Sequence, residues 1–208
     1  MNIDKLKQAE ANFLQHYPGG FQDPEMVAIG KKHNVNRMTE LSQEQLSKKS
    51  FANVGPVLES LTKIVGRSSM VSMFEKPKFR DYVNSLNTDT RHSLAAGFKS
   101  LLHGSSERSR EKGFNQVLDV LTEGKIGKWS LISICPLYVH PNREVFVKPT
   151  TAKRIIEHLE LENLVYKPRP SWEFYSEFRR QVLEMKAQVD PSLAPSNAAF
   201  TGFLMMSL

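Results

Sequence analysis

The sequence predicts a mainly α protein, a single multi-helix domain with a small β-hairpin near residues 129–148. Apolar residues recur at helical spacing through most of the chain, most regularly over 56–65. Serine, aspartate or proline opens many of these stripes and glycine closes them, which is typical of separate short helices. The pattern changes at 129–147, where β-branched and aromatic residues run together. We expect about nine or ten helices in all.

The N-terminal half is predicted to be helical throughout. A stripe over 3–16 ends before a Pro-Gly-Gly run, and Asp23 with Pro24 starts a second helix that should end near Lys32. Ser42 and Gln45 form a weak capping box, which predicts only one more short helical turn. The remaining helices are expected at 56–65, stopped by a left-handed Gly66, and then at 77–86 and 89–103.

The C-terminal half contains the predicted change of structure. A helix over 106–123 should end at Gly124, and two strands, 129–139 and 145–147, should pair across a turn at 140–143. The later elements are expected to be a helix over 150–159, an extended connector at 165–170, a long helix over 172–189 and an apolar tail helix over 197–206. We assign 1–208 to one domain, with a soft boundary at 104–128 as the alternative division.

Composition favours a folded protein of the cytoplasm. Apolar residues make up 40% of the chain and charged residues 24%, which is ordinary globular usage. Cys135 is the only cysteine, as in proteins of reducing compartments, so no internal disulfide can form. The N-terminal residues are charged and no apolar run reaches 18 residues, so we predict neither export nor a membrane span. The net charge of +6 is spread along the chain and favours a polyanionic partner only weakly.

No catalytic residue, metal or cofactor is predicted. Cys135 and His140 could form a nucleophile and base, but no third group orients them, so a buried structural cysteine is the preferred interpretation. No two of the six histidines have the i, i+4 spacing of a helical metal pair. Phosphate-binding glycine motifs are also absent, and the basic glycine loop at 124–128 is interpreted as a solvated turn.

Cations and aromatic rings alternate between residues 125 and 176, which is the main functional signal of the sequence. Lysine and arginine neutralise phosphates while aromatic faces stack on bases, so this mixture favours contact with nucleic acid. The alternative is that the rings are core anchors and the cations a solvated rim. The residues predicted to bind nucleic acid or another anion are Lys128, Arg143, Lys148, Lys153, Arg154, Arg169, Trp172 and Tyr175.

Three other functional interpretations stay open at this point. The order helix, helix, hairpin over 89–103, 106–123 and 129–148 is that of a winged helix. An enzyme acting on a small anionic substrate would use His140, Arg143, Lys148, Tyr166 and Trp172. The apolar tail at 200–208 would serve a protein interface or a homo-oligomer if it were exposed.

Part of this segment resembles an uncharacterised bacterial protein family. In that family a tryptophan-led strand precedes a Phe-x-Lys-Pro turn, and a tyrosine and a Pro-x-Trp-x-x-Tyr element follow a helix. In this chain the corresponding elements would be Trp129, residues 146–149, Tyr166 and residues 170–175, so the resemblance covers 129–176 only. The tail at 199–203 differs from the more polar, acidic element that the family has there. The resemblance implies no reaction, cofactor or partner, and the same residues could form a packing hinge.

Overall fold

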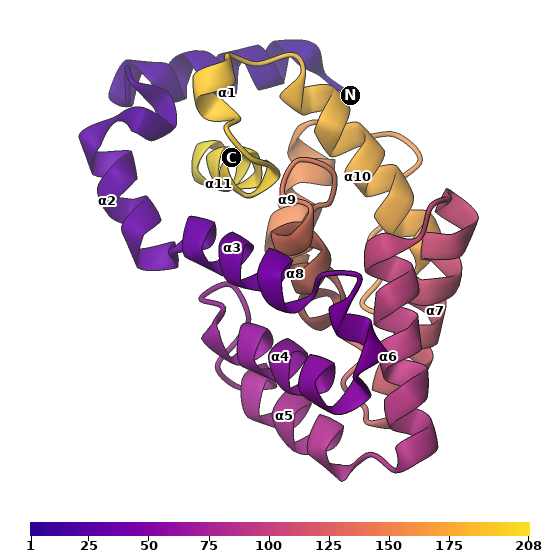
Figure 1. The fold of residues 1–208 in the computed structure, drawn as a ribbon. Coiled ribbons are helices and arrows are strands. Elements are labelled where there is room, and N and C mark those ends of the chain that lie inside the picture. Colours follow the sequence, from indigo (N-terminus) through magenta and orange to yellow (C-terminus); the bar gives the residue numbers. More distant parts are fainter.

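The protein, described over all of residues 1–208 by a computed structural model, is built from helices alone (Figure 1). Eleven α-helices and three short 3-10 helices follow one another along the chain. The mainly α prediction is therefore confirmed. The predicted β-hairpin is wrong, because the chain forms no strand between residues 129 and 148 or elsewhere.

Helices α1 and α2 lie along one rim of the molecule, and α3 runs from there across its middle (Figure 1). Asn2 caps α1 (Ile3–His16), and Asp23 caps α2 (Pro24–His33) ahead of a proline at its first position. Asn34 then adopts a left-handed conformation, with φ of 49°, and the chain turns into α3 (Val35–Gln45). The prediction of a single short turn in this region was wrong, because Asn34 is a kink between two helices and not the end of helical structure.

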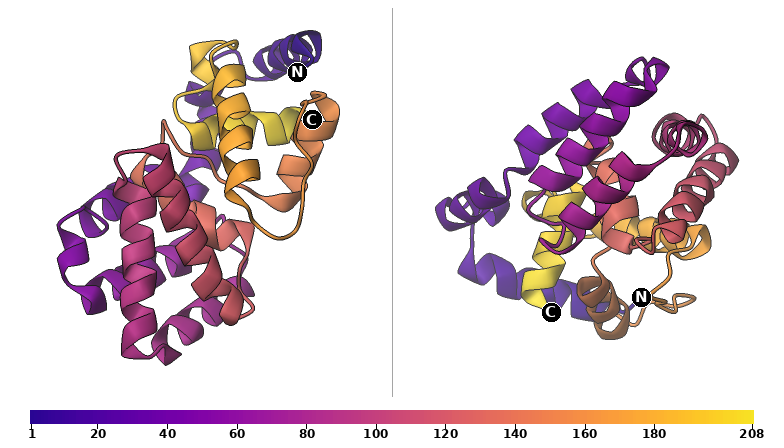
Figure 2. Two further views of the ribbon diagram at one scale, coloured as in Figure 1. Left: turned by 90° about the vertical axis from the view of Figure 1, so that its right-hand side faces the viewer. Right: turned by 90° about the horizontal axis from the view of Figure 1, so that it is seen from below.

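The next four helices form the other end of the molecule (Figure 2, left). They are α4 (Val54–Arg67), α5 (Glu75–Ser85), α6 (Thr88–His103) and α7 (Glu107–Glu123). Helix α4 continues through Gly66 instead of stopping there in a left-handed conformation. Helices α6 and α7 approach most closely at Gly113, where an added Cβ would lie 2.3 Å from the backbone nitrogen of Leu101. The alternative domain boundary at 104–128 thus falls on a helix packed against its neighbour.

Helix α8 (Trp129–Val139) stands where the first strand of the hairpin was predicted. All eleven of its residues are buried, and it packs among α3, α4, α6 and α7. A helix buried on every side needs no polar face, so its sequence lacks the helical period that would have identified it. Residues 140–147 return along it without strand pairing, held by the amide of Val147, which donates to Ser133 Oγ at 3.0 Å. Without a hairpin, the winged-helix interpretation has no wing.

The remaining helices close the upper part of the molecule around α1 (Figure 2, left). They are α9 (Pro149–His158), α10 (Trp172–Lys186) and α11 (Asn197–Ser207). The tail helix α11 is anchored in the core: the side chain of Asn197 is fully buried, and the ring of Phe203 meets that of Phe13 edge-on at 5.3 Å. Only Met205 and Met206 are well exposed, so the tail offers little free apolar surface to a second copy.

A single cluster of 53 buried apolar residues runs from Leu6 to Leu204 and involves every part of the chain. None of the eleven helices combines the length and apolar character needed to cross a bilayer.

Candidate functional site

The structure divides the eight predicted anion-binding residues into two groups. Five cations are exposed, as a surface interaction requires, and they are Lys128, Lys148, Lys153, Arg154 and Arg169. The other three residues turn inward: Trp172 is 8% exposed, Tyr175 is fully buried, and Arg143 is half-buried beside a carboxylate. Neither predicted ring can stack on a base at the surface.

Several of the exposed cations belong to segments that contact the first two turns of α8. Trp129 Nε1 donates to the carbonyl oxygen of Lys167 at 2.8 Å, which holds the 165–171 connector against the start of the helix. Ser133 Oγ donates to the carbonyl of Trp129 at 2.6 Å and accepts from the amide of Val147, so the residue before Lys148 is bonded to the second turn of α8. The buried helix therefore positions cations from three separate chain segments.

The aromatic residues of this region form a buried support beneath the cations. Trp129 packs against Phe174 at 5.1 Å between ring centroids, and Phe174 meets Tyr166 edge-on at 5.9 Å. The ammonium of Lys153 lies 5.0 Å from the centroid of the half-buried Tyr166 ring. Burial raises the pKa of Tyr166, so its hydroxyl stays neutral near pH 7. The rings thus fix where the cations stand, as the core-anchor alternative supposed.

Sequence reasoning missed an exposed ring beside these cations. Met73 and Phe74 are each 74% exposed in the link that leads into α5. The next residue, Glu75, accepts a hydrogen bond of 2.5 Å from Ser130 Oγ, which ties this link to the first turn of α8. The sequence does contain a signal for this site, because Met73 and Phe74 are two large apolar residues between polar neighbours. It was overlooked because both residues precede the cation-rich segment 125–176.

We call the exposed cations and this ring together the basic face. Its members are Phe74, Lys125, Lys128, Lys148, Lys153, Arg154, Lys167 and Arg169. None of its seven cations lies within 4 Å of a carboxylate. In residues 125–176 the exposed carboxylates without a cation partner are only Glu157, Glu162 and Glu173. The face therefore carries an excess of unneutralised positive charge.

The inward group surrounds a buried carboxylate that the sequence did not single out. Glu144 is 2% exposed and accepts hydrogen bonds from Arg143 Nε at 2.8 Å, from the hydroxyl of Tyr175 at 3.0 Å and from Arg179 Nη1 at 3.0 Å. Arg179 also donates to Glu107 of α7 at 2.8 Å, so this ionic cluster joins α7, the 140–147 segment and α10. Its signal in the sequence was an arginine on the otherwise apolar face of α10.

The pKa shifts in the ionic cluster agree with a permanently charged, structural role. Burial and the adjacent charge of Glu144 raise the pKa of Tyr175 well above its usual value. Burial opposes the charge on Arg179, but the neighbouring carboxylate of Glu144 outweighs it and raises the guanidinium pKa further. Burial by itself would raise the pKa of Glu107, but hydrogen bonds from Arg110 and the charge of Arg179 lower it overall. Near neutral pH, Tyr175 therefore stays neutral, and Arg179 and Glu107 stay charged.

The residues of the enzyme interpretation do not converge. His140 Nε2 lies 2.7 Å from the carbonyl of Leu102, and Arg143 reaches the same oxygen at 3.4 Å. Lys148 and Tyr166 belong to the basic face and its support, and Trp172 packs under Phe114. Cys135 is fully buried, and burial raises the pKa of its thiol to about 12, so no thiolate is available. No three His, Cys, Asp or Glu side chains are grouped as a metal site would require.

Comparison of this chain with protein-family models, with curated proteins and with solved structures gave no match. The resemblance over residues 129–176 therefore stays a prediction, and the Trp-led segment that it expects as a strand is the helix α8.

Proposed function

We propose that this protein is a non-enzymatic binding protein that contacts single-stranded nucleic acid through the basic face. The observation that carries the proposal is a set of seven exposed cations without a carboxylate partner, several of them on segments that contact the start of α8, together with the exposed ring of Phe74 in the link that is bonded to Ser130. Unpaired lysines keep their charge available to phosphates, whereas an arginine already bound to a carboxylate does not.

Single strands suit this arrangement better than a duplex. A splayed base can lie on one exposed ring, and base stacking contributes roughly 1 to 3 kcal/mol for each base. Helix α8 is buried on all sides, so it cannot enter a major groove as a recognition helix does. The buried rings Trp129, Trp172 and Tyr175 support the face and do not touch the ligand.

Fluorescence anisotropy with labelled single-stranded RNA, single-stranded DNA and duplex DNA tests the proposal. If about four of the cations contact phosphates, log K should fall with log salt with a slope near −3 for single strands. Measurements between about 50 and 200 mM salt resolve this slope, because the affinity should fall by well over tenfold across that range. No binding of any of these probes at the low-salt end would refute the proposal.

Matched substitutions locate the contact. Lys128→Gln with Lys148→Gln should reduce affinity and make the salt slope shallower by roughly one for each lost contact, and Phe74→Ala should weaken binding without changing the slope. Lys112→Gln is the control, because that exposed and unpaired lysine lies on α7 and is not part of the basic face. Equal effects of Lys112→Gln and Lys128→Gln would point to diffuse attraction and not to this face.

A further inference from the structure

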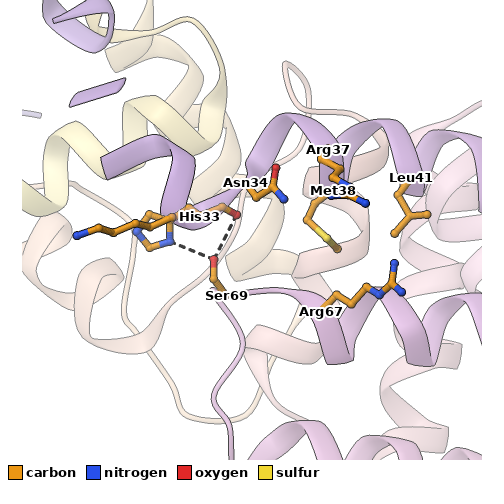
Figure 3. Close-up of a pocket in the computed structure, with 8 residues that line it drawn as sticks. His33, Asn34, Arg37, Met38, Leu41, Arg67 and Ser69 are labelled. Atoms are coloured by element: carbon orange, nitrogen blue, oxygen red, sulfur yellow. Dashed lines mark hydrogen bonds between the residues drawn. The ribbon is translucent and has the colours of Figure 1, made fainter. Parts of the chain in front are cut away.

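A second cationic feature lies where α2, α3 and the end of α4 meet (Figure 3). A hollow of about 370 Å³ opens there, and its eight lining residues include three cations and no carboxylate. Arg37 of α3 and Arg67 of α4 stand on opposite sides of it, with Met38 and Leu41 between them (Figure 3). The lining residues are Lys32, His33, Asn34, Arg37, Met38, Leu41, Arg67 and Ser69.

The three cations of this hollow have no partner in the chain. Lys32, Arg37 and Arg67 make no ion pair with any carboxylate. This differs from Arg110 and Arg180, for example, which bind acidic neighbours on their own helix. Holding two guanidinium groups and an ammonium around one concavity is unfavourable unless an anion or solvent screens them.

A backbone turn and one side-chain contact shape the edge of the hollow. Asn34 turns the chain in its left-handed conformation, and His33 Nδ1 lies 3.0 Å from Ser69 Oγ across the hollow's edge (Figure 3). That contact joins the end of α2 to the link after α4. The α3 N-terminus has no side-chain cap and presents free amides, while α2 and α4 end nearby with partial negative charge. The partial positive charge at the start of α3 and the partial negative charges at the ends of α2 and α4 oppose one another. The three charged side chains therefore make the electrostatic potential of the hollow positive.

We propose that this hollow binds the phosphate monoester of a small organic molecule. Two planar guanidinium groups match the oxygens of a phosphate, and the three cations suffice to neutralise its two negative charges. The volume of about 370 Å³ exceeds what inorganic phosphate fills and falls in the range of small-molecule sites. Met38, only 5% exposed, and the half-buried Leu41 supply an apolar wall for the organic part of the ester.

This site is separate from the basic face. Ser68, next to the hollow's Ser69, hydrogen-bonds through Oγ to the hydroxyl of Tyr138 at 2.8 Å, at the C-terminal end of α8. The basic face surrounds Trp129 at the other end, roughly 14 Å away along the helix axis at 1.5 Å per residue. The proposal consequently does not depend on nucleic-acid binding.

Titration of the full chain with phenyl phosphate, followed by amide NMR shifts and calorimetry, tests the proposal. Saturable binding should move the amides of α3's first turn, and inorganic phosphate should bind at the same amides at least several-fold more weakly. Arg37→Gln and Arg67→Gln should each weaken phenyl phosphate by roughly tenfold or more. Leu41→Asn should reduce the preference for phenyl over inorganic phosphate.

Arg108→Gln on α7 is the matched control, because that arginine is also exposed and unpaired. Circular dichroism of each variant confirms that the fold is kept. The proposal is overturned if phenyl phosphate does not saturate, if Arg37→Gln and Arg67→Gln bind it as the wild type does, or if Arg108→Gln weakens it equally. It is also overturned if an oligonucleotide displaces phenyl phosphate and these two variants lose oligonucleotide binding in parallel, because the hollow would then be part of a nucleic-acid surface.

Discussion

Replacing Glu144 with glutamine should strongly destabilise the fold. The carboxylate is 2% exposed and receives donors from Arg143, Tyr175 and Arg179. Glutamine of nearly the same shape removes the charge and turns an amide N–H₂ toward groups that are themselves donors. Breaking a buried pair by removing one partner costs about 3 to 5 kcal/mol, because the other charge stays buried.

The lower end of that range applies here. Arg179 keeps a second partner in Glu107, whose side chain is 57% exposed and so offers a solvated charge at 2.8 Å. We therefore expect Glu144→Gln to lower the free energy of unfolding by about 3 kcal/mol, which for a chain of this length lowers Tm by roughly 6 to 12 °C. Arg179→Met should also destabilise the fold, but by less than Glu144→Gln, since Glu144 loses one buried partner and keeps Arg143 and the Tyr175 hydroxyl.

Urea unfolding followed by circular dichroism measures both variants and the pair of them together. The double variant should cost about 2 kcal/mol less than the sum of the single variants, because it leaves neither charge stranded. Arg180→Met provides the control on the next residue: Arg180 is exposed and pairs with Glu177 and Glu184, so its loss should leave stability near that of the wild type. A cost for Glu144→Gln below about 1 kcal/mol, or strictly additive effects, would refute the buried ionic cluster as a stabilising unit.

Three further predictions concern packing, pH and thiol reactivity. Gly113→Ala should lower the free energy of unfolding by about 1 to 3 kcal/mol, because the added Cβ would clash with the α6 backbone. Gly66→Ala should be neutral or slightly stabilising, because a Cβ there has no neighbour within 4 Å. Thermal unfolding of both variants checks this. Burial lowers the pKa of His103 and His140, so the folded state favours the neutral rings. The free energy of unfolding should therefore fall as the pH drops below about 6.5. His140→Gln should flatten that dependence, and an unchanged pH profile in this variant would contradict the prediction. Cys135 should resist thiol reagents in the native protein and react once urea unfolds it, and rapid native labelling would show that the site opens.

The helices with one polar face could be predicted from the sequence, and the buried helix could not. In α4, apolar residues such as Val57, Leu61 and Ile64 recur on one side, so both the helix and its buried face were predicted. In α8 every side faces protein, and the remaining signal, β-branched residues with Pro136 among them, is shared with strands. Pro136 is tolerated in the last turn of α8 and did not mark its end.

The candidate site was predicted in part for a related reason. Side-chain charge largely determines exposure for lysine, so the positions of Lys128, Lys148 and Lys153 on the surface followed from residue type. An aromatic ring is used equally well in a core and on a binding surface, and only the fold decides which. Trp172 was expected at the surface and is buried, whereas Phe74 received no functional prediction and is exposed.

The two proposed sites share a structural origin in α8. Helix α8 is completely enclosed, so each site is built on segments that pack against one of its ends. The 73–75 link and the 147–148 and 165–171 segments lie at one end, and the link after α4 lies at the other. A substitution that loosens α8 should therefore disturb both sites at once, whereas Lys128→Gln should affect only nucleic acid and Arg67→Gln only phenyl phosphate. Ser133→Ala removes the hydrogen bond that seats Val147 inside the protein and leaves a buried amide without a partner, at a cost of about 1 to 3 kcal/mol. This one change should weaken nucleic-acid binding by the basic face, because it displaces Lys148, while the hollow at the far end should still bind phenyl phosphate.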